Sequence, residues 1–165
     1  MSPTHIYKFA KILLILILYT APTLASTIGE DGLHKEPWFR ETFKDMAEDF
    51  AEAEDENKRL VVIFEQRGCI YCKEMHEKVF SDPKIKATIE DNFFVIQMNL
   101  FGDVEVTDFD GETLSEKKMA EKWGIFFTPT MLFMPKNIVE AGVASDVAAV
   151  TVPGAFKKGT TYHLL

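Results

Sequence analysis

Cysteine is scarce in this chain: among its 165 residues, Cys69 and Cys72 are the only two. Two thiols cannot build a disulfide-rich scaffold, and a structural zinc site needs four ligands, which the nearby His76 does not complete. Lys73 directly follows the second cysteine, where attachment of a c-type haem requires histidine. The chain therefore carries a single thiol feature, a Cys-x-x-Cys pair, with metal binding left as an alternative.

The sequence also lacks an excess of positive charge and a long hydrophobic run. Its formal net charge of -8 argues against a nucleic-acid partner and against an anionic membrane surface. The unbroken apolar run at 12–19 is shorter than the roughly 20 residues that span a bilayer as a helix. No internal repeat is present, and 165 residues suit one domain.

Residues 1–25 match the pattern of a secretory signal peptide. Lys8 and Lys11 flank the start of the apolar run without any acidic residue, and the small side chain of Ala25 suits cleavage before Ser26. An uncleaved membrane anchor is the alternative. We therefore expect export to the periplasm, where so close a cysteine pair forms a disulfide unless a partner reduces it.

Beyond residues 26–36, which we predict to be a flexible leader, residues 37–165 have the pattern of one domain. Pro37 suits the first turn of a helix, and apolar side chains recur from Trp38 at helical spacing. Strands and helices then alternate, which favours an α/β fold. We expect further helices at 69–80, 81–91 and 114–123, and strands at 60–64, 93–100, 126–134 and within 138–152. We also expect an acidic loop at 101–112, with a small hairpin as one form of it, and a last helix after Gly154 too short to cover one face of the sheet well.

The Cys-x-x-Cys pair lies between a strand and a helix, a placement that suits thiol–disulfide exchange. A thiolate attacks a disulfide, and the dipole and free N–H groups of a helix start lower the pKa of a cysteine located there. Cys69 is therefore the expected nucleophile, and Cys72, three residues later, resolves the mixed disulfide. A structural disulfide is the alternative, although so small a loop would restrict the unfolded chain little. The exchange requires neither a metal nor an organic cofactor.

The chain resembles the thioredoxin-fold superfamily, through Cys69-x-x-Cys72 after a buried strand and Phe127-Thr128-Pro129-Thr130 before a later one. The resemblance implies a central mixed β-sheet of about four to five strands flanked by helices, ending in a helix packed on the sheet. The apolar spacing from Trp38 adds an N-terminal helix extension, and the few residues after Gly154 leave the C-terminal helix short or truncated. The resemblance also implies that Pro129 is a cis-proline facing the cysteines, and that the backbone of Thr128 contacts the substrate.

Within this superfamily the chain resembles the periplasmic SoxW-type thioredoxins, through residues 64–72, the acidic stretch 102–112, Thr128-Pro129-Thr130 and Pro153-Gly154. The resemblance implies a periplasmic thiol–disulfide oxidoreductase that reduces an exported partner protein and receives electrons from a membrane thiol transporter of the CcdA/DsbD type. We expect a monomer. A Dsb-type disulfide isomerase or oxidase is one alternative, and a non-catalytic binding module with idle thiols is another.

One departure from the thioredoxin pattern concerns the proton acceptor. Thioredoxin carries a buried aspartate six residues before the first cysteine, where this chain has Ile63. Glu65 shares a strand face with Ile63, so we hypothesise that it accepts the proton of Cys72; the alternative is an acid at a strand end that reaches solvent. Tyr71, between the cysteines, is a candidate substrate contact. The remaining predictions place His76 on the outside of its helix and Trp38, Phe43 and Trp123 in the core.

Overall fold

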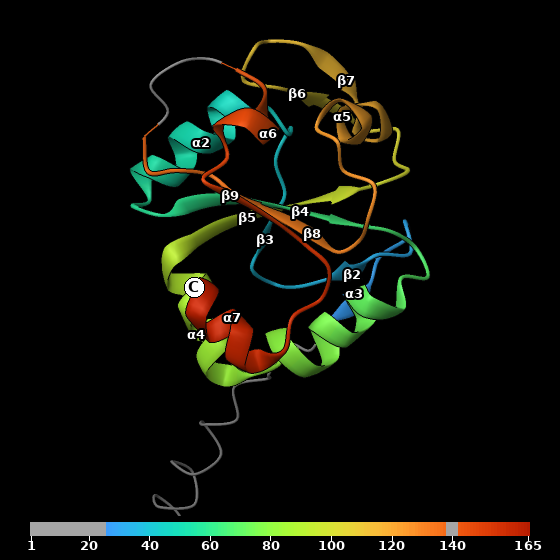
Figure 1. Ribbon diagram of the computed structural model, residues 1–165, viewed down its shortest axis with the longest axis vertical. Coiled ribbons are helices and arrows are strands. Elements are labelled where there is room, and N and C mark those ends of the chain that lie inside the picture. The colour runs from blue at the N-terminus through green and yellow to red at the C-terminus, as the bar shows by residue number, and fades with distance from the viewer. Residues whose placement is uncertain (1–25, 138–141) are drawn as a thin grey trace, which may run out of the picture.

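The computed structural model describes residues 26–137 and 142–165; the predicted signal peptide at 1–25 lies outside them. A five-stranded sheet in the order β3-β5-β4-β8-β9 forms the centre (Figure 1). β3, β5 and β4 run parallel, whereas β8 and β9 are antiparallel to their neighbours. The predicted α/β fold with a mixed sheet is therefore confirmed. The strands are β3 (Phe39–Arg40), β4 (Arg59–Glu65), β5 (Phe93–Asn99), β8 (Thr130–Phe133) and β9 (Val150–Pro153).

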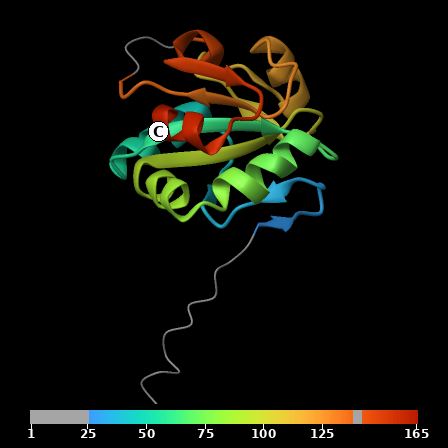
Figure 2. The same ribbon diagram turned by 60° about the horizontal axis from the view of Figure 1, so that its bottom comes forward.

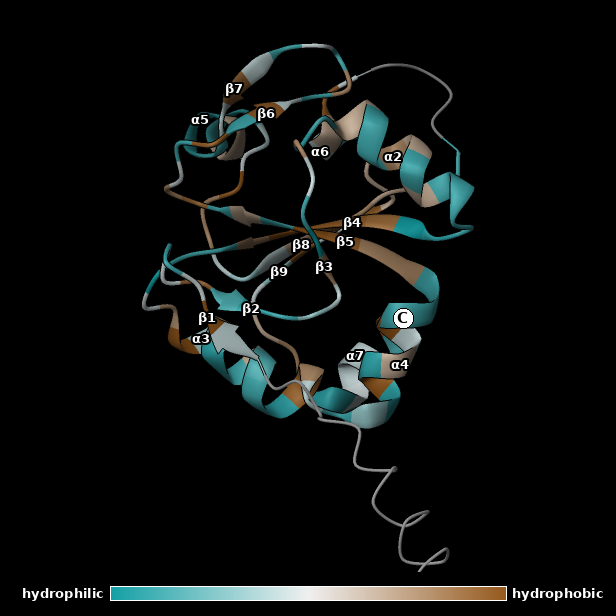
Figure 3. Cartoon of the chain, turned by 180° about the vertical axis from the view of Figure 1, so that it is seen from behind, coloured by the Kyte–Doolittle hydropathy of each residue, from teal (hydrophilic) through white to brown (hydrophobic). Residues whose placement is uncertain are grey.

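Strand β4 is the most deeply buried element of the sheet. Its apolar run Leu60–Phe64 has at most 1% of each side chain exposed. Because side chains alternate along a strand, Val62 packs into the core on one face and Ile63 into the core on the other. A strand buried on both faces needs such a continuous apolar run. Figure 3 shows the largely hydrophobic colour of β4 and β5 in the middle of the structure, between helices that carry many hydrophilic residues.

Helices cover both faces of the sheet (Figure 1). α2 (Met46–Asp55), α5 (Glu116–Lys122) and α6 (Ala144–Val147) supply buried residues to the core on one face. η2 (Met75–Phe80), the π-helical continuation of α3 (Ile70–Glu74), and α4 (Pro83–Asn92) supply buried residues to the core on the other face. The predicted helices at 69–80, 81–91 and 114–123 are thus confirmed. Within 26–137 and 142–165, no helix is long and apolar enough to cross a membrane.

The N-terminal helix begins later than its periodicity predicted. Trp38 lies before β3 and Phe39 within it, and both pack against the sheet rather than in a helix. The helix starts only at Met46, where the carboxylate of Asp45 accepts hydrogen bonds from two backbone N–H groups of the first turn. Phe43, predicted to be buried, is 94% exposed because it lies in the connecting segment between β3 and the helix.

The segment at 26–36, predicted to be a flexible leader, forms a hairpin in which β1 (Thr27–Ile28) pairs with β2 (His34–Lys35). The hairpin lies beside helix α3 (Figure 2). The guanidinium of Arg67, in the loop after β4, donates to the backbone oxygens of Glu30 and Asp31. The hairpin is therefore held against the loop that leads to the cysteines.

A second hairpin, β6 (Glu105–Thr107) with β7 (Thr113–Ser115), begins in the acidic stretch at 101–112, for which a loop or a small hairpin was expected, and ends just after it. Asp108 between the two strands is buried and accepts hydrogen bonds from the indole N–H of Trp123 and the backbone N–H of Ala144. This carboxylate therefore joins the hairpin to α5 and α6.

The last helix, α7 (Lys158–Leu164), is short, as predicted. The expected poor coverage of the sheet is wrong, because Phe156 and Leu165 pack against the core on that face. Lys158 and Tyr162 also bind the carboxylate of Asp82, at the start of α4, which anchors α7 to that helix.

Gly102 approaches the buried carboxylate of Glu116 so closely that an added Cβ would overlap its Oε2. Glu116 is held in place by Lys44 and by the backbone N–H of Asn99. We expect Gly102→Ala to lower the free energy of unfolding by about 1–3 kcal/mol, measured by urea denaturation. Gly159→Ala, in α7 with no atom near its added Cβ, should raise it by roughly 0.5–1 kcal/mol. Equal stability of Gly102→Ala and the wild type would contradict the packing.

Candidate active site

Cys69 and Cys72 form a disulfide at the carboxyl end of β4, with their Cα atoms 5.2 Å apart. Cys69 caps the start of α3, and its Sγ accepts a hydrogen bond of 3.0 Å from the backbone N–H of Cys72. Cys69 is 9% exposed and Cys72 is 1% exposed. An incoming sulfur can therefore approach Cys69 but not Cys72.

The loop before β8 lies against Cys69. The hydroxyl of Thr128 donates to Cys69 Sγ at 3.3 Å, and the carbonyl oxygen of Thr128 lies 3.6 Å from the same sulfur. The Thr128–Pro129 peptide bond is cis. Residues 59 positions apart in the sequence thus meet at the disulfide.

Exposed apolar side chains surround the disulfide. Ile70 and Tyr71 on one side, and Phe126 and Phe127 on the other, are each more than half exposed. They line a shallow cleft of about 310 Å³ that also contains Cys69. A contiguous apolar surface beside a cysteine is suited to hold a polypeptide.

Glu65 is fully buried at the end of β4, which excludes the alternative that it reaches solvent. Its carboxylate accepts hydrogen bonds from Gln97 Nε2 at 2.5 Å and pairs with His76 Nε2 at 2.9 Å. The prediction that His76 lies on the outside of its helix is wrong: it is 1% exposed, and its Nδ1 lies 2.8 Å from Glu36 Oε1. Its burial is made favourable by two carboxylates, one at each ring nitrogen.

The imidazole of His76 is held as a cation. Burial alone would lower the pKa of His76, but its hydrogen bonds to Glu36 and Glu65, and the charges of these carboxylates, outweigh burial and raise this pKa to about 9. Only the protonated ring donates from both nitrogens, as two carboxylate partners require.

Comparison with known proteins places this geometry in a family. Residues 46–140 match the model of the thioredoxin-like domain. The chain belongs to the thioredoxin-like domain family. Among curated proteins, no sequence matches this chain significantly.

Two solved structures are similar to this thioredoxin-like chain. A thioredoxin from Thermus thermophilus superposes with a TM-score of 0.55 at 18% identity, covering 73% of this chain and 80% of that one. The C-terminal domain of DsbD from Neisseria meningitidis, in its oxidised form, gives a TM-score of 0.48 at 17% identity, covering 72% and 87%. At these identities the first match shows the fold alone.

Two basic residues close to the cysteines in sequence, Arg67 and Lys73, have partners other than the disulfide. Arg67 donates to the β1–β2 hairpin, and Lys73 pairs with Glu77 at 3.7 Å on the helix surface. In the part of the chain that the structure describes, no group of three or more His, Cys, Asp or Glu side chains is arranged to hold a metal ion.

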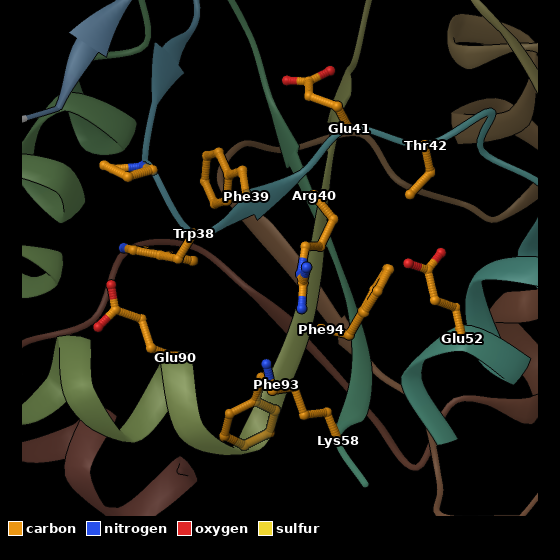
Figure 4. Close-up of a pocket in the computed structure, with 11 residues that line it drawn as sticks. Trp38, Phe39, Arg40, Glu41, Thr42, Glu52, Lys58, Glu90, Phe93 and Phe94 are labelled. Carbon is orange, nitrogen blue, oxygen red and sulfur yellow. The ribbon is translucent and has the colours of Figure 1, made fainter. Parts of the chain in front are cut away.

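A separate groove of about 420 Å³ lies along β3 (Figure 4). Arg40 stacks over the ring of Phe94, 4.8 Å from its centroid, and Trp38 lines the same groove. Phe93 and Lys58 place it at the amino ends of β5 and β4, opposite the end of the sheet that carries the cysteines. This groove is therefore not part of the disulfide site.

Sequence reasoning placed the two cysteines and Thr128 but missed Glu36 and His76. A histidine four residues after Cys72 faces the same side of the helix as that cysteine, which is a usable signal. Glu36 offers no such signal, because its contact with His76 spans 40 residues.

We expect Thr128→Val to weaken the thiolate of Cys69 in the reduced protein, because the valine cannot donate to Sγ. Hydrogen bonds to charged groups contribute about 1.5–3 kcal/mol, so the pKa of Cys69 should rise by roughly one to two units. The measurement is the pH dependence of Cys69 alkylation, with Thr128→Ser as the control that keeps the hydroxyl. An unchanged pH profile in Thr128→Val would contradict this role.

The raised pKa of His76 predicts how stability depends on pH. A group whose pKa rises on folding, here from 6.5 to about 9, stabilises the fold fully below pH 6.5 and loses that contribution as pH rises through 9. The free energy of unfolding should fall over this range by on the order of 3 kcal/mol, measured by denaturant titration of the disulfide form. His76→Gln should abolish this decline, whereas His163→Gln, at the surface end of α7, should retain it.

Proposed function

We propose that this protein is a thiol–disulfide oxidoreductase that acts on protein disulfides. The observation that carries the proposal is Cys69 itself: its sulfur is the accessible member of a Cys-x-x-Cys disulfide and accepts a hydrogen bond from Thr128. The thioredoxin-like fold and this pair together point to the same chemistry. The exposed apolar residues beside Cys69 supply a surface for a polypeptide substrate.

The reaction in the reducing direction has two steps. The thiolate of Cys69 attacks one sulfur of the substrate disulfide, that bond breaks, and the second substrate sulfur leaves as a thiolate that takes a proton. Cys72 then loses its proton and attacks Cys69, which forms the Cys69–Cys72 disulfide and releases the first substrate sulfur. Two electrons pass from the dithiol to the substrate, and an external reductant must return them.

Glu65 is our candidate acceptor for the Cys72 proton. It lies on the helix-facing side of β4, fully buried, and contacts His76, one helical turn beyond Cys72. A buried carboxylate can act as a general base here: it accepts the proton of Cys72 as that sulfur attacks Cys69.

We further propose that the protein is exported and acts in the periplasm as a SoxW-type thioredoxin. The signal-peptide pattern at 1–25 and the acidic stretch at 102–112 support this assignment. A membrane thiol transporter of the CcdA/DsbD type would then supply the electrons, and an exported protein disulfide would receive them.

Alkylation kinetics test the chemistry. In the reduced protein, Cys69 should react with iodoacetamide near neutral pH at least ten times faster than a thiol of an unfolded peptide, because its thiolate is stabilised. Cys72 should react more slowly than Cys69, since it is buried. A Cys69 no faster than the peptide thiol would reject the catalytic assignment and favour a binding module.

A trapping experiment tests the partner. Cys72→Ser, expressed in the cell that exports the protein, should accumulate a mixed disulfide between Cys69 and the partner, identified by mass spectrometry after diagonal electrophoresis. Cys69→Ser is the matched control and should capture no protein. Capture of folded proteins whose existing disulfide is being reduced supports a reductase. Capture of proteins that are still acquiring their disulfides contradicts that direction and favours a Dsb-type oxidase or isomerase.

A further inference from the structure

Three buried ionisable groups contact one another in a row: Glu36, His76 and Glu65, here called the Glu–His–Glu array. The two contacts measure 2.8 and 2.9 Å, one to each ring nitrogen. The exposed fractions of the three side chains are 6%, 0% and 1% in that order. The exchange chemistry above uses Glu65 alone, so the other two members need an explanation.

The array shares a helix face with Cys72. His76 follows Cys72 by four residues, so both side chains lie on the same face of the helix, and both are 1% exposed. Glu65 faces the same side from the end of β4.

The opposite end of the array reaches a groove of about 750 Å³. Glu36 and His34, both from the N-terminal hairpin segment, line this groove together with His76, and Glu36 is the most exposed member of the array. The array therefore runs from the helix face of Cys72 to an opening in the surface.

Charge explains why three members are needed. With His76 protonated and both glutamates ionised, the array carries one net negative charge, and one added proton neutralises it. Burial disfavours net charge, so proton uptake by this array is favoured. A pair of Glu65 and His76 alone would be neutral, and the same proton would leave it with a buried positive charge.

Other charged groups around His76 do not alter this count. His34 stacks on its ring, with centroids 4.7 Å apart, and burial and the charge of His76 lower the pKa of His34, which favours its neutral form. On its own helix, Lys73 and Glu77 pair with each other. Behind Glu65, the amide of Gln97 binds Lys35, which pairs with Asp31.

We propose that Glu36 and His76 are positioning residues that make Glu65 an effective base: the array takes up the Cys72 proton during resolution and returns it to solvent through the groove at Glu36. The proposal rests on the thiol–disulfide function above. In the step, the S–H bond of Cys72 breaks, its proton enters the array, and the electron pair left on sulfur forms the bond to Cys69. The two electrons leave with the substrate thiolate.

Thermodynamic linkage provides a direct test on the wild-type protein. Linkage applies to equilibria: if Cys72 and the array share a proton in the dithiol form, reduction must shift the pKa of His76, and protonation of His76 must shift the redox equilibrium by the same factor. We expect the pKa of His76, followed by NMR of its ring nitrogens, to differ by about one unit or more between the disulfide and dithiol forms. An identical titration in both forms would overturn the proposal.

Glu36→Gln tests the role of the third member. It keeps the side-chain shape but makes the array neutral, so resolution of a mixed disulfide with a chromophoric peptide should slow at least tenfold, with the first attack by Cys69 unchanged. Glu77→Gln is the matched control: it removes an exposed carboxylate from the same groove without touching His76, and should resolve at the wild-type rate. Wild-type resolution by Glu36→Gln would reject the array.

These outcomes separate the two proposals. A slowly reacting Cys69 in the wild type rejects the oxidoreductase function itself. A fast Cys69 with a redox-independent His76 rejects only the array. If Glu36→Gln fails to fold, the titration of His76 in the two redox forms of the wild type still decides.

Discussion

Burial of one carboxylate constrains the structure on the helix side of the disulfide. Glu65 ends the central strand without any exposed surface, and an unpaired charge there would cost several kcal/mol. Donors must therefore reach it from two directions, His76 from η2 and Gln97 from β5. His76 in turn requires Glu36, which draws the N-terminal hairpin onto the helix. The placement of four separate elements thus follows from the solvation of a single group.

The elements that sequence reasoning located carry their signals locally. The run Leu60–Phe64 predicts a strand buried on both faces, because only that environment removes five consecutive apolar side chains from water. Asp82-Pro83 predicts the start of α4, since a capping carboxylate followed by proline is typical of the first turn of a helix. Thr128 could be placed opposite Cys69 only through the resemblance to thioredoxins, because no local pattern connects residues 59 positions apart.

What the sequence could not reveal depends on contacts distant along the chain. The spacing of Trp38 and Phe43 fits a helix, but a sheet edge recruits Trp38 and leaves Phe43 in solvent. Tertiary packing thereby overrides periodicity. The spacing of His76 from Cys72 puts it on the buried face of the helix, but burial of an imidazole becomes favourable only once Glu36 and Glu65 supply acceptors from 40 and 11 residues away. The burial of a polar side chain can therefore be predicted only together with the partners that form hydrogen bonds to it.

The segment that matches the family model is shorter than the segment that builds the surroundings of the disulfide and the Glu–His–Glu array. The family match begins at Met46, whereas Glu36 and the hairpin that supports it lie before that residue. Transplanting residues 46–140 into another protein would carry over both cysteines and Thr128 but leave His76 with one carboxylate instead of two. The recipient would inherit the redox motif with a different internal acidity. In this chain, the domain boundary set by sequence similarity leaves out a residue, Glu36, that the buried ionisable groups require.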